Sequence, residues 1–112
     1  MQEAQTYWFD VGPVTAIPLR GARTVKTPRR EIAVFRTATN DVFALENKCP
    51  HKGGPLSEGI VHGHKVACPL HNWIIDLESG GATGADQGCA RKFPVKIERG
   101  RIYLDMGMAA QA

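Results

Sequence analysis

Short runs of apolar and β-prone residues recur along the chain and are separated by turn-forming residues. The runs are YWF, VTAI, IAVFR, VFAL, KVAC, WIIDL, VKI and RIYLD, at 7–9, 14–17, 32–36, 42–45, 65–68, 73–77, 95–97 and 101–105. This spacing is typical of an all-β sandwich or barrel. No segment combines a helical period with caps at both ends. We therefore expect an all-β fold.

Turn-forming residues indicate how the runs pair. Asn40 and Asp41 lie between two runs, and Gly100 lies between two others, so each pair is expected to form an antiparallel hairpin. Residues 78–88 are rich in glycine and are expected to form an ordered loop or turn. Residues 107–112 form a tail that we expect to fray.

The length and composition fit one globular domain. The chain has 112 residues, 43% of them hydrophobic and 22% charged, so we expect a single domain over residues 1–112. No apolar run approaches the length needed to cross a bilayer, and the start of the chain does not resemble a secretory signal. We expect a cytoplasmic protein without a membrane partner.

Positive charge is concentrated in one run. The net charge is +3, and residues 20–30 contain five cations and no acid. This run has no aromatic residue that could stack on a base, and it matches no nucleic-acid motif. We expect a solvated loop or a docking edge for an acidic protein, and no nucleic-acid partner.

Two short stretches each carry one thiol and one imidazole. Cys49 and His51 flank Pro50, and after sixteen intervening residues Cys68 and His71 follow with Pro69 between them. Prolines stiffen such loops, and the nearby Gly53 and Gly54 permit tight turns and close backbone approach. These ligand types suit a metal centre with nitrogen and sulfur donors.

The pattern leaves two kinds of centre open. A structural zinc finger usually groups its cysteines on one knuckle and its histidines on another, whereas here each stretch supplies one of each. The alternative is a two-iron cluster with both cysteines on one iron and both histidines on the other. Two similar loops facing each other could reach both irons.

The remaining candidate ligands fit less well. An odd cysteine count, three, argues against a disulfide framework. Cys89 matches neither ligand spacing, so we expect a small buried residue there. His62 and His64 alternate around a glycine and are expected to face solvent.

The two stretches resemble the ligand motifs of the Rieske family of 2Fe-2S proteins. The resemblance implies an antiparallel β sandwich or barrel with two cluster-binding loops, at residues 47–56 and 67–77. It also implies that Cys49, His51, Cys68 and His71 bind a Rieske-type 2Fe-2S cluster that carries electrons, with no catalytic residue on this chain.

Residues 46–104 are most similar to the small subunit of assimilatory NAD(P)H-dependent nitrite reductase, through CPHKGGPLS, CPLHNW followed by DL, and the GAD and FPV segments. In that family a large subunit with FAD, an iron-sulfur cluster and sirohaem reduces nitrite to ammonium in nitrate assimilation. The small subunit relays electrons or supports assembly and is not catalytic alone. Two alternatives remain: a soluble Rieske ferredoxin for a ring-hydroxylating dioxygenase, and a zinc-stabilised assembly module.

Four positions narrow the choice within the Rieske family. Quinol-oxidising members carry a disulfide across the loops, where this chain has Gly54 and Leu70. High-potential members place hydroxyl donors where this chain has Trp73 and Ile75. The resemblance thus implies a low-potential cluster. We expect its small and apolar end, including Pro55, to dock on a partner, steered by the basic run.

Overall fold

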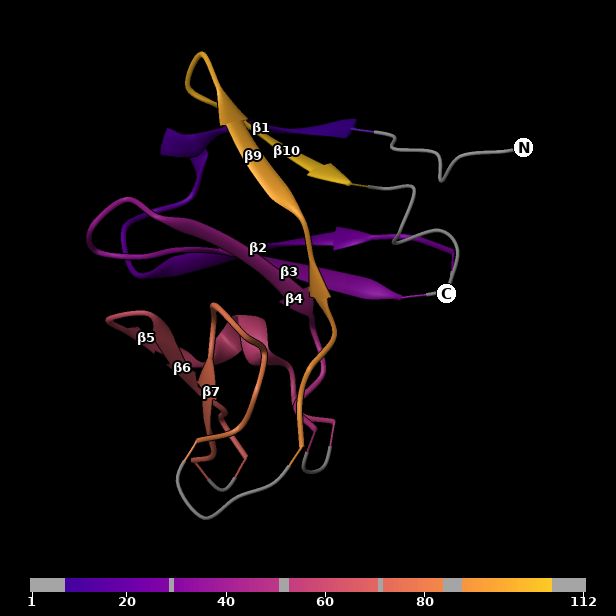
Figure 1. The fold of residues 1–112 in the computed structure, drawn as a ribbon, viewed down its shortest axis with the longest axis vertical. Coiled ribbons are helices and arrows are strands. Elements are labelled where there is room, and N and C mark those ends of the chain that lie inside the picture. Colours follow the sequence, from indigo (N-terminus) through magenta and orange to yellow (C-terminus); the bar gives the residue numbers. More distant parts are fainter. Residues whose placement is uncertain (1–7, 29, 51–52, 71, 84–87, 106–112) are drawn as a thin grey trace.

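The strands form three antiparallel sheets in a computed structural model that describes residues 8–28, 30–50, 53–70, 72–83 and 88–105 (Figure 1). The outer sheet has the order β1 (Trp8–Pro13), β10 (Arg101–Asp105), β9 (Val95–Glu98). The central sheet has the order β2 (Gly21–Lys26), β3 (Glu31–Arg36), β4 (Val42–Glu46), β8 (Lys92–Phe93). The loop-side sheet has the order β5 (Ile60–His62), β6 (Lys65–Ala67), β7 (Ile74–Asp76). The prediction of an all-β fold is confirmed.

The central sheet is buried on both faces, which explains the continuous apolar run IAVF in β3. Ile32 and Val34 belong to a core shared with the outer sheet, whereas Ala33 and Phe35 belong to a core shared with the loop-side sheet. Successive strand residues point to opposite faces, so a strand covered on both sides reads as a run rather than an alternation. The three sheets therefore stack as layers around two cores (Figure 1).

Both predicted hairpins are confirmed. β3 and β4 pair antiparallel around a turn in which Asn40 has a φ of 71°. β9 and β10 pair antiparallel around Arg99 and Gly100, with φ of 52° and 77°. Positive φ at both central residues gives the turn twist that suits a tight hairpin.

The run VTAI was expected to be a strand, and this prediction is wrong. Residues Val14–Ala16 form a short 3-10 helix, η1. Val14 and Ile17 are both buried in the core under the outer sheet, and the Ile17 amide donates to the Val14 carbonyl at 3.1 Å. Residues three apart lie on one face of a 3-10 turn, so this conformation buries both side chains, which a strand would place on opposite faces.

One expectation for the basic run was a solvated loop, and for most of the run this expectation is wrong. Residues Gly21–Lys26 form β2, an edge strand of the central sheet paired along its length with β3. Arg23 and Lys26 are exposed on it, and charged side chains on an edge strand discourage pairing with other chains. Arg30 instead folds inward, 3.5 Å from Glu46 and 5.6 Å from the Phe93 ring centroid, while Arg29 lies outside the described residues.

A second 3-10 helix, η2 (Leu56–Glu58), connects the central and loop-side sheets and buries Leu56. Across the described ranges of the chain, no helix has the length and apolar character needed to span a membrane. Residues 84–87 of the glycine-rich segment and the tail 107–112 lie outside those ranges. Elsewhere in that segment, the Gly80 amide donates to the Asp76 carbonyl at 2.7 Å, which forms the expected turn after β7.

Candidate metal centre

The first loop leaves β4 and closes on itself at Cys49. The Cys49 amide donates to the Gly54 carbonyl at 2.8 Å, and the Gly53 amide donates to the Cys49 carbonyl at 2.8 Å. Gly53 has a φ of 74°, a conformation that glycine adopts without steric cost. The loop therefore forms a tight turn that begins at a cysteine, Cys49.

Asn47 anchors this loop to two elements. Its amide donates to the Glu31 carbonyl at 2.8 Å, and its side-chain Nδ2 donates to Glu31 Oε2 at 3.0 Å. Its Oδ1 accepts a hydrogen bond from the Ser57 amide at 2.7 Å. Asn47 thus ties the loop to β3 and to η2. Sequence reasoning did not single it out, because nothing in the sequence states that its amide reaches residues so far apart.

The second loop joins β6 to β7 and has the same design. The Cys68 amide donates to the Trp73 carbonyl at 2.7 Å, which closes the loop around the intervening residues. The Leu70 amide donates to the Cys68 sulfur at 3.4 Å. Asn72 takes a φ of 59°, which asparagine tolerates better than most residues. One amide of this loop is thus already directed at sulfur.

The two loops bring their thiols together. Cys49 and Cys68 are 2% and 0% exposed and belong to the same core. Burial raises the pKa of the Cys68 thiol, and a hydrogen bond with Cys49 raises this pKa further. Two buried thiols that share a hydrogen bond are poor nucleophiles, but they become thiolates when a metal replaces their protons. The pair is suited to ligation rather than to thiol chemistry.

Gly54 keeps space free beside the Cys68 sulfur. A Cβ at residue 54 would lie 3.1 Å from Cys68 Sγ and 3.0 Å from Leu70 Cγ. These distances are shorter than ordinary contacts between such atoms. The missing side chain therefore leaves room where the loops meet, and with two buried thiols the described residues fit a sulfur-ligated centre.

His51 and His71 lie outside the described residues. Among the residues that are described, no group of three or more His, Cys, Asp or Glu side chains is arranged to hold a metal. The structure thus brings together the two predicted cysteines. Residues 51 and 71 belong in sequence to the two loops that these cysteines begin.

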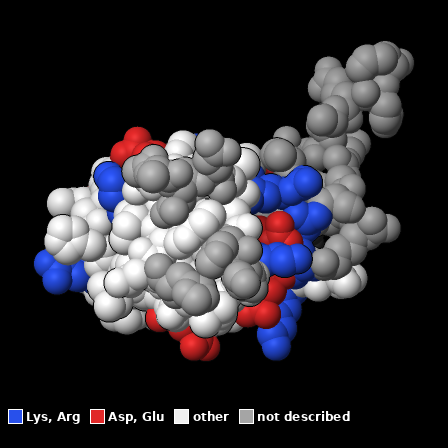
Figure 2. All heavy atoms as spheres, turned by 90° about the horizontal axis from the view of Figure 1, so that it is seen from below, with Lys and Arg blue, Asp and Glu red and all other residues white. Residues whose placement is uncertain are grey.

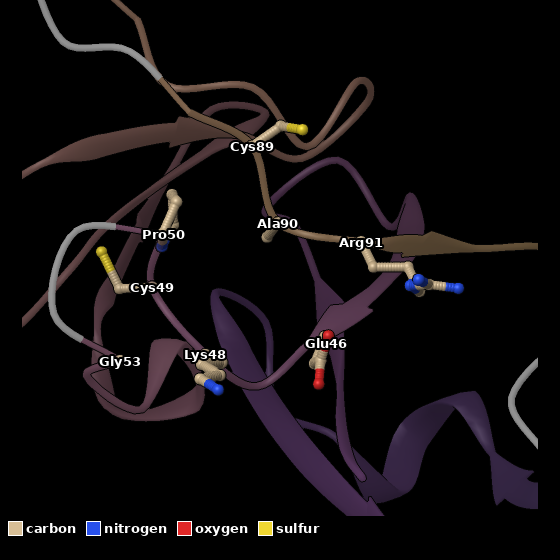
Figure 3. A pocket seen from close by; sticks show the side chains of 8 residues that line it. All are labelled: Glu46, Lys48, Cys49, Pro50, Gly53, Cys89, Ala90 and Arg91. Carbon is tan, nitrogen blue, oxygen red and sulfur yellow. The ribbon is translucent and has the colours of Figure 1, made fainter. Parts of the chain in front are cut away.

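Cys89 was expected to be buried, and this expectation is wrong. Its side chain is exposed, whereas the following residue, Ala90, is 6% exposed and belongs to the core. Alternation along this extended segment directs the smaller side chain inward. In Figure 3, Cys89 shares a surface hollow with Cys49 and Pro50, and its thiol points away from Cys49. The structure gives no reason to add it to the ligand set.

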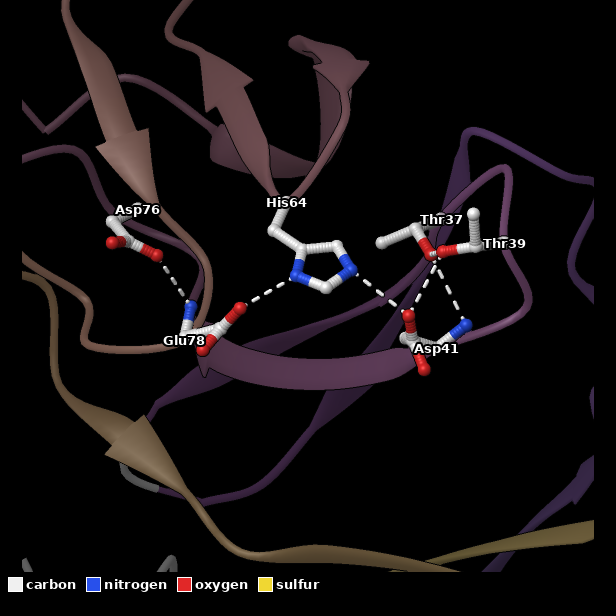
Figure 4. A network of polar contacts seen from close by, with 6 residues as sticks. All are labelled: Thr37, Thr39, Asp41, His64, Asp76 and Glu78. Atoms are coloured by element: carbon white, nitrogen blue, oxygen red, sulfur yellow. Dashed lines mark hydrogen bonds and ion pairs between the residues drawn. The ribbon is translucent and has the colours of Figure 1, made fainter.

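The two other histidines differ from each other. His62 is exposed, as expected. His64 was also expected to face solvent, but its Nδ1 lies 2.5 Å from Glu78 Oε2 and its Nε2 lies 2.9 Å from Asp41 Oδ2 (Figure 4). These hydrogen bonds raise the pKa of His64, with Glu78 the larger cause. His64 links the β5–β6 turn to the β3–β4 turn and to the end of β7.

At the end of the molecule that carries the loops, the charged side chains of the described residues lie towards the edge. Figure 2, seen from that end, shows uncharged side chains among the described residues at the centre, with Lys, Arg, Asp and Glu side chains towards the edge. Leu70 is 42% exposed, and Pro69 is exposed. A protein partner that docks on these described residues would remove few of their charges from water.

Together, the layered β sheets and the two loops define a β domain with a pair of buried thiols where the loops meet. The sequence model of the Rieske [2Fe-2S] domain matches residues 7–94, and the chain belongs to this family. Its cofactor is a Rieske-type 2Fe-2S cluster, so the zinc alternative is dropped. When bound, such a cluster supplies one-electron transfer.

The sequence relatives include proteins of two sizes. The chain is 34% identical over 116 residues to 4beta-methylsterol monooxygenase of Methylococcus capsulatus, covering 95% of this chain but 31% of that protein. It is 31% identical over 100 residues to the ferredoxin component of the naphthalene 1,2-dioxygenase/salicylate 5-hydroxylase systems of a Ralstonia species, covering 88% of this chain and 95% of that protein.

Solved structures of two kinds share the fold. A Mycobacterium tuberculosis protein described as an NADH-dependent nitrite reductase small subunit has a TM-score of 0.80 at 21% identity, with 89% of this chain and 95% of that chain covered. A complex of oxygenase and ferredoxin in carbazole 1,9a-dioxygenase gives a TM-score of 0.80 at 22% identity, with 90% and 94% covered. At this identity the likeness shows the fold alone.

Proposed function

We propose that Cys49, His51, Cys68 and His71 are the four cluster ligands of one Rieske domain spanning residues 1–112. In this family the two cysteines ligate one iron and the two histidines the other. The observation that supports this most directly is the pair of buried thiols, one from each loop, in a single core. The chain's own contribution is to hold the loops in position through Asn47 and the backbone bonds of Cys49 and Cys68.

As its biological role, we propose a cytoplasmic small subunit of an NAD(P)H-dependent nitrite reductase, which reduces nitrite to ammonium. The motif residues between 46 and 104 carry this proposal, because CPHKGGPLS, CPLHNW and FPV match that family closely. The structural likeness to the Mycobacterium tuberculosis protein over most of both chains is compatible with it. The partner would be a large subunit with FAD, an iron-sulfur cluster and sirohaem.

The second candidate is a ferredoxin that feeds a ring-hydroxylating dioxygenase. The Ralstonia ferredoxin component favours it, because this chain is 31% identical to that protein and covers 95% of it. Both candidates use the same cluster and the same end of the molecule, so the site alone does not separate them. The partner does.

A reconstitution experiment separates the two roles. The chain is expressed with the large sirohaem subunit of the same organism and purified through a tag on the large subunit. We expect the two to co-purify, and NAD(P)H-dependent ammonium formation from nitrite to depend on the chain. No association and no effect on nitrite reduction, together with electron delivery to a dioxygenase from its reductase, would favour the ferredoxin role instead.

A further inference from the structure

Leu70 lies where the two loops meet. Its backbone amide donates to the Cys68 sulfur at 3.4 Å. A single point, the Cβ position that Gly54 lacks, is 3.0 Å from both Leu70 Cγ and Leu70 Cδ1 and 3.1 Å from Cys68 Sγ. The space beside Gly54 is therefore bounded by the Leu70 side chain and by the Cys68 sulfur. Leu70 is also 42% exposed, so only part of its side chain faces inward.

We propose that the contact between Leu70 and Gly54, here called the loop clamp, holds the second loop against the first and keeps water from the Cys68 side of the cluster. The clamp is apolar on both sides, so it needs no polar partner at the exposed tip. Gly54 is buried, and any side chain there would displace Leu70 or crowd the sulfur. Leu70 thus positions the second loop, and its side chain packs against Gly54 of the first loop.

The Leu70 side chain should affect how easily water reaches the Cys68 sulfur and, through this, the midpoint potential of the cluster. Truncating Leu70 removes the apolar cover but keeps the backbone amide that donates to sulfur. Water then reaches the sulfur more often, because local opening of the loops becomes easier. Greater solvent exposure stabilises the more negative reduced cluster and raises the midpoint potential.

The test uses the cluster-loaded protein and the variants Leu70→Ala, Leu70→Met and Gly54→Ala. The readouts are the rate at which an iron chelator bleaches the visible absorption and the midpoint potential in a dye titration. We expect Leu70→Ala to bleach on the order of tenfold faster and to have a higher midpoint potential. Leu70→Met, which keeps apolar volume, should stay near the parent rate. Leu19→Ala is the control, since Leu19 is 53% exposed and lies in neither loop.

The reciprocal substitution adds a second criterion. Gly54→Ala alone should accelerate bleaching, and combining it with Leu70→Ala should accelerate bleaching by less than the product of the two separate factors, because the residues act through one contact. Parent-like bleaching and potential in Leu70→Ala, or independent effects in the double variant, would overturn the clamp. So would bleaching in Leu70→Met as fast as in Leu70→Ala.

The clamp rests on the proposed ligand role of Cys68, and the two can fail separately. Cys68→Ala should abolish iron binding outright, whereas Leu70→Ala should assemble a cluster that is labile. A Cys68→Ala protein with a full cluster would refute the ligand assignment. A normal Leu70→Ala cluster beside an empty Cys68→Ala protein would refute only the clamp.

Discussion

At the scale of single residues, the proposed ligands and the exposed third cysteine are expected to behave oppositely. Replacing Cys49, His51, Cys68 or His71 by alanine leaves an incomplete ligand set, so iron content should fall to near zero and the loops should lose the stability that metal binding gives them. Iron and acid-labile sulfide analysis of each purified variant measures this.

Cys89→Ser is the matched control, because Cys89 is a cysteine on the same hollow as Cys49 but points away from it (Figure 3). It should keep the full iron content. Loss of iron in Cys89→Ser, or full iron in any of the four alanine variants, would contradict the ligand assignment.

His64 should make stability depend on pH. Both ring nitrogens lie against carboxylates, so the folded state favours the protonated ring and the pKa of His64 is raised above its ordinary value of 6.5. A raised folded pKa means that this contribution is fully present below the unfolded pKa and is lost as pH rises through the folded pKa.

The measurement is the free energy of unfolding in urea, for the parent and for His64→Gln, at a series of pH values below and above 6.5. The parent should be the more stable of the two below pH 6.5, and the difference should shrink as pH rises above this value. His62→Gln, at an exposed histidine two residues earlier, is the matched control variant. A stability difference between the parent and His64→Gln that does not change with pH would refute the account of His64.

At the scale of elements, Gly59 sets how closely β5 can lie to β6. A Cβ at this residue would lie 2.2 Å from the Ala67 carbonyl oxygen, on the residue that precedes Cys68. Gly59→Ala should therefore destabilise the protein by about 1–3 kcal/mol, because backbone must move. Chemical denaturation measures the loss.

Gly81→Ala is the matched control for Gly59→Ala. The nearest atom to a Cβ at Gly81 is the Ser79 hydroxyl at 3.4 Å, an ordinary contact. Its effect should stay within about 0.5 kcal/mol. Equal losses in the two variants would show that close approach to β6 is not the reason for glycine at residue 59.

The elements also show where sequence reasoning works. The strands β3, β4, β9 and β10 could be predicted because each combines a β-prone apolar run with a turn residue that favours positive φ. The edge strand β2 could not, because arginine, threonine and lysine lie on it and only pairing with β3 reveals it. The prediction of a strand for VTAI was wrong for the opposite reason, because its β-prone residues Val14 and Ile17 are buried by a 3-10 turn.

At the candidate metal centre and around it, too, only features set by local sequence could be predicted. The two cysteines could be predicted from spacing and the resemblance, because loop motifs carry their own geometry. The anchoring role of Asn47 and the pairing of His64 depend on residues 10 to 23 positions away, through Ser57, Glu31, Glu78 and Asp41. No local pattern encodes such contacts.

At the scale of the whole molecule, the cluster should have a low potential for its family. Ile75 is fully buried in the core that holds both cysteines, and isoleucine cannot donate a hydrogen bond. Trp73 packs against the same core and offers only an indole N–H. The reduced cluster thus lacks hydroxyl donors at these positions, and we expect a midpoint on the order of −150 to 0 mV.

A potential in that range suits electron transfer from a flavin reduced by NAD(P)H, as the proposed nitrite reductase requires. Protein-film voltammetry or a dye titration measures it. A midpoint above about +150 mV would contradict both the hydrogen-bond argument and the low-potential assignment.

We infer that this chain holds a Rieske cluster with mixed cysteine and histidine ligation, and hyperfine spectroscopy distinguishes this ligation from all-cysteine ligation. The anaerobically purified protein, labelled with ¹⁵N-histidine, is reduced and measured by pulsed electron paramagnetic resonance. We expect couplings from the nitrogens of two histidines, and the loss of one coupling or of the whole cluster in His51→Ala and in His71→Ala. A reduced cluster without histidine couplings, or a protein that holds zinc and no iron, would contradict it.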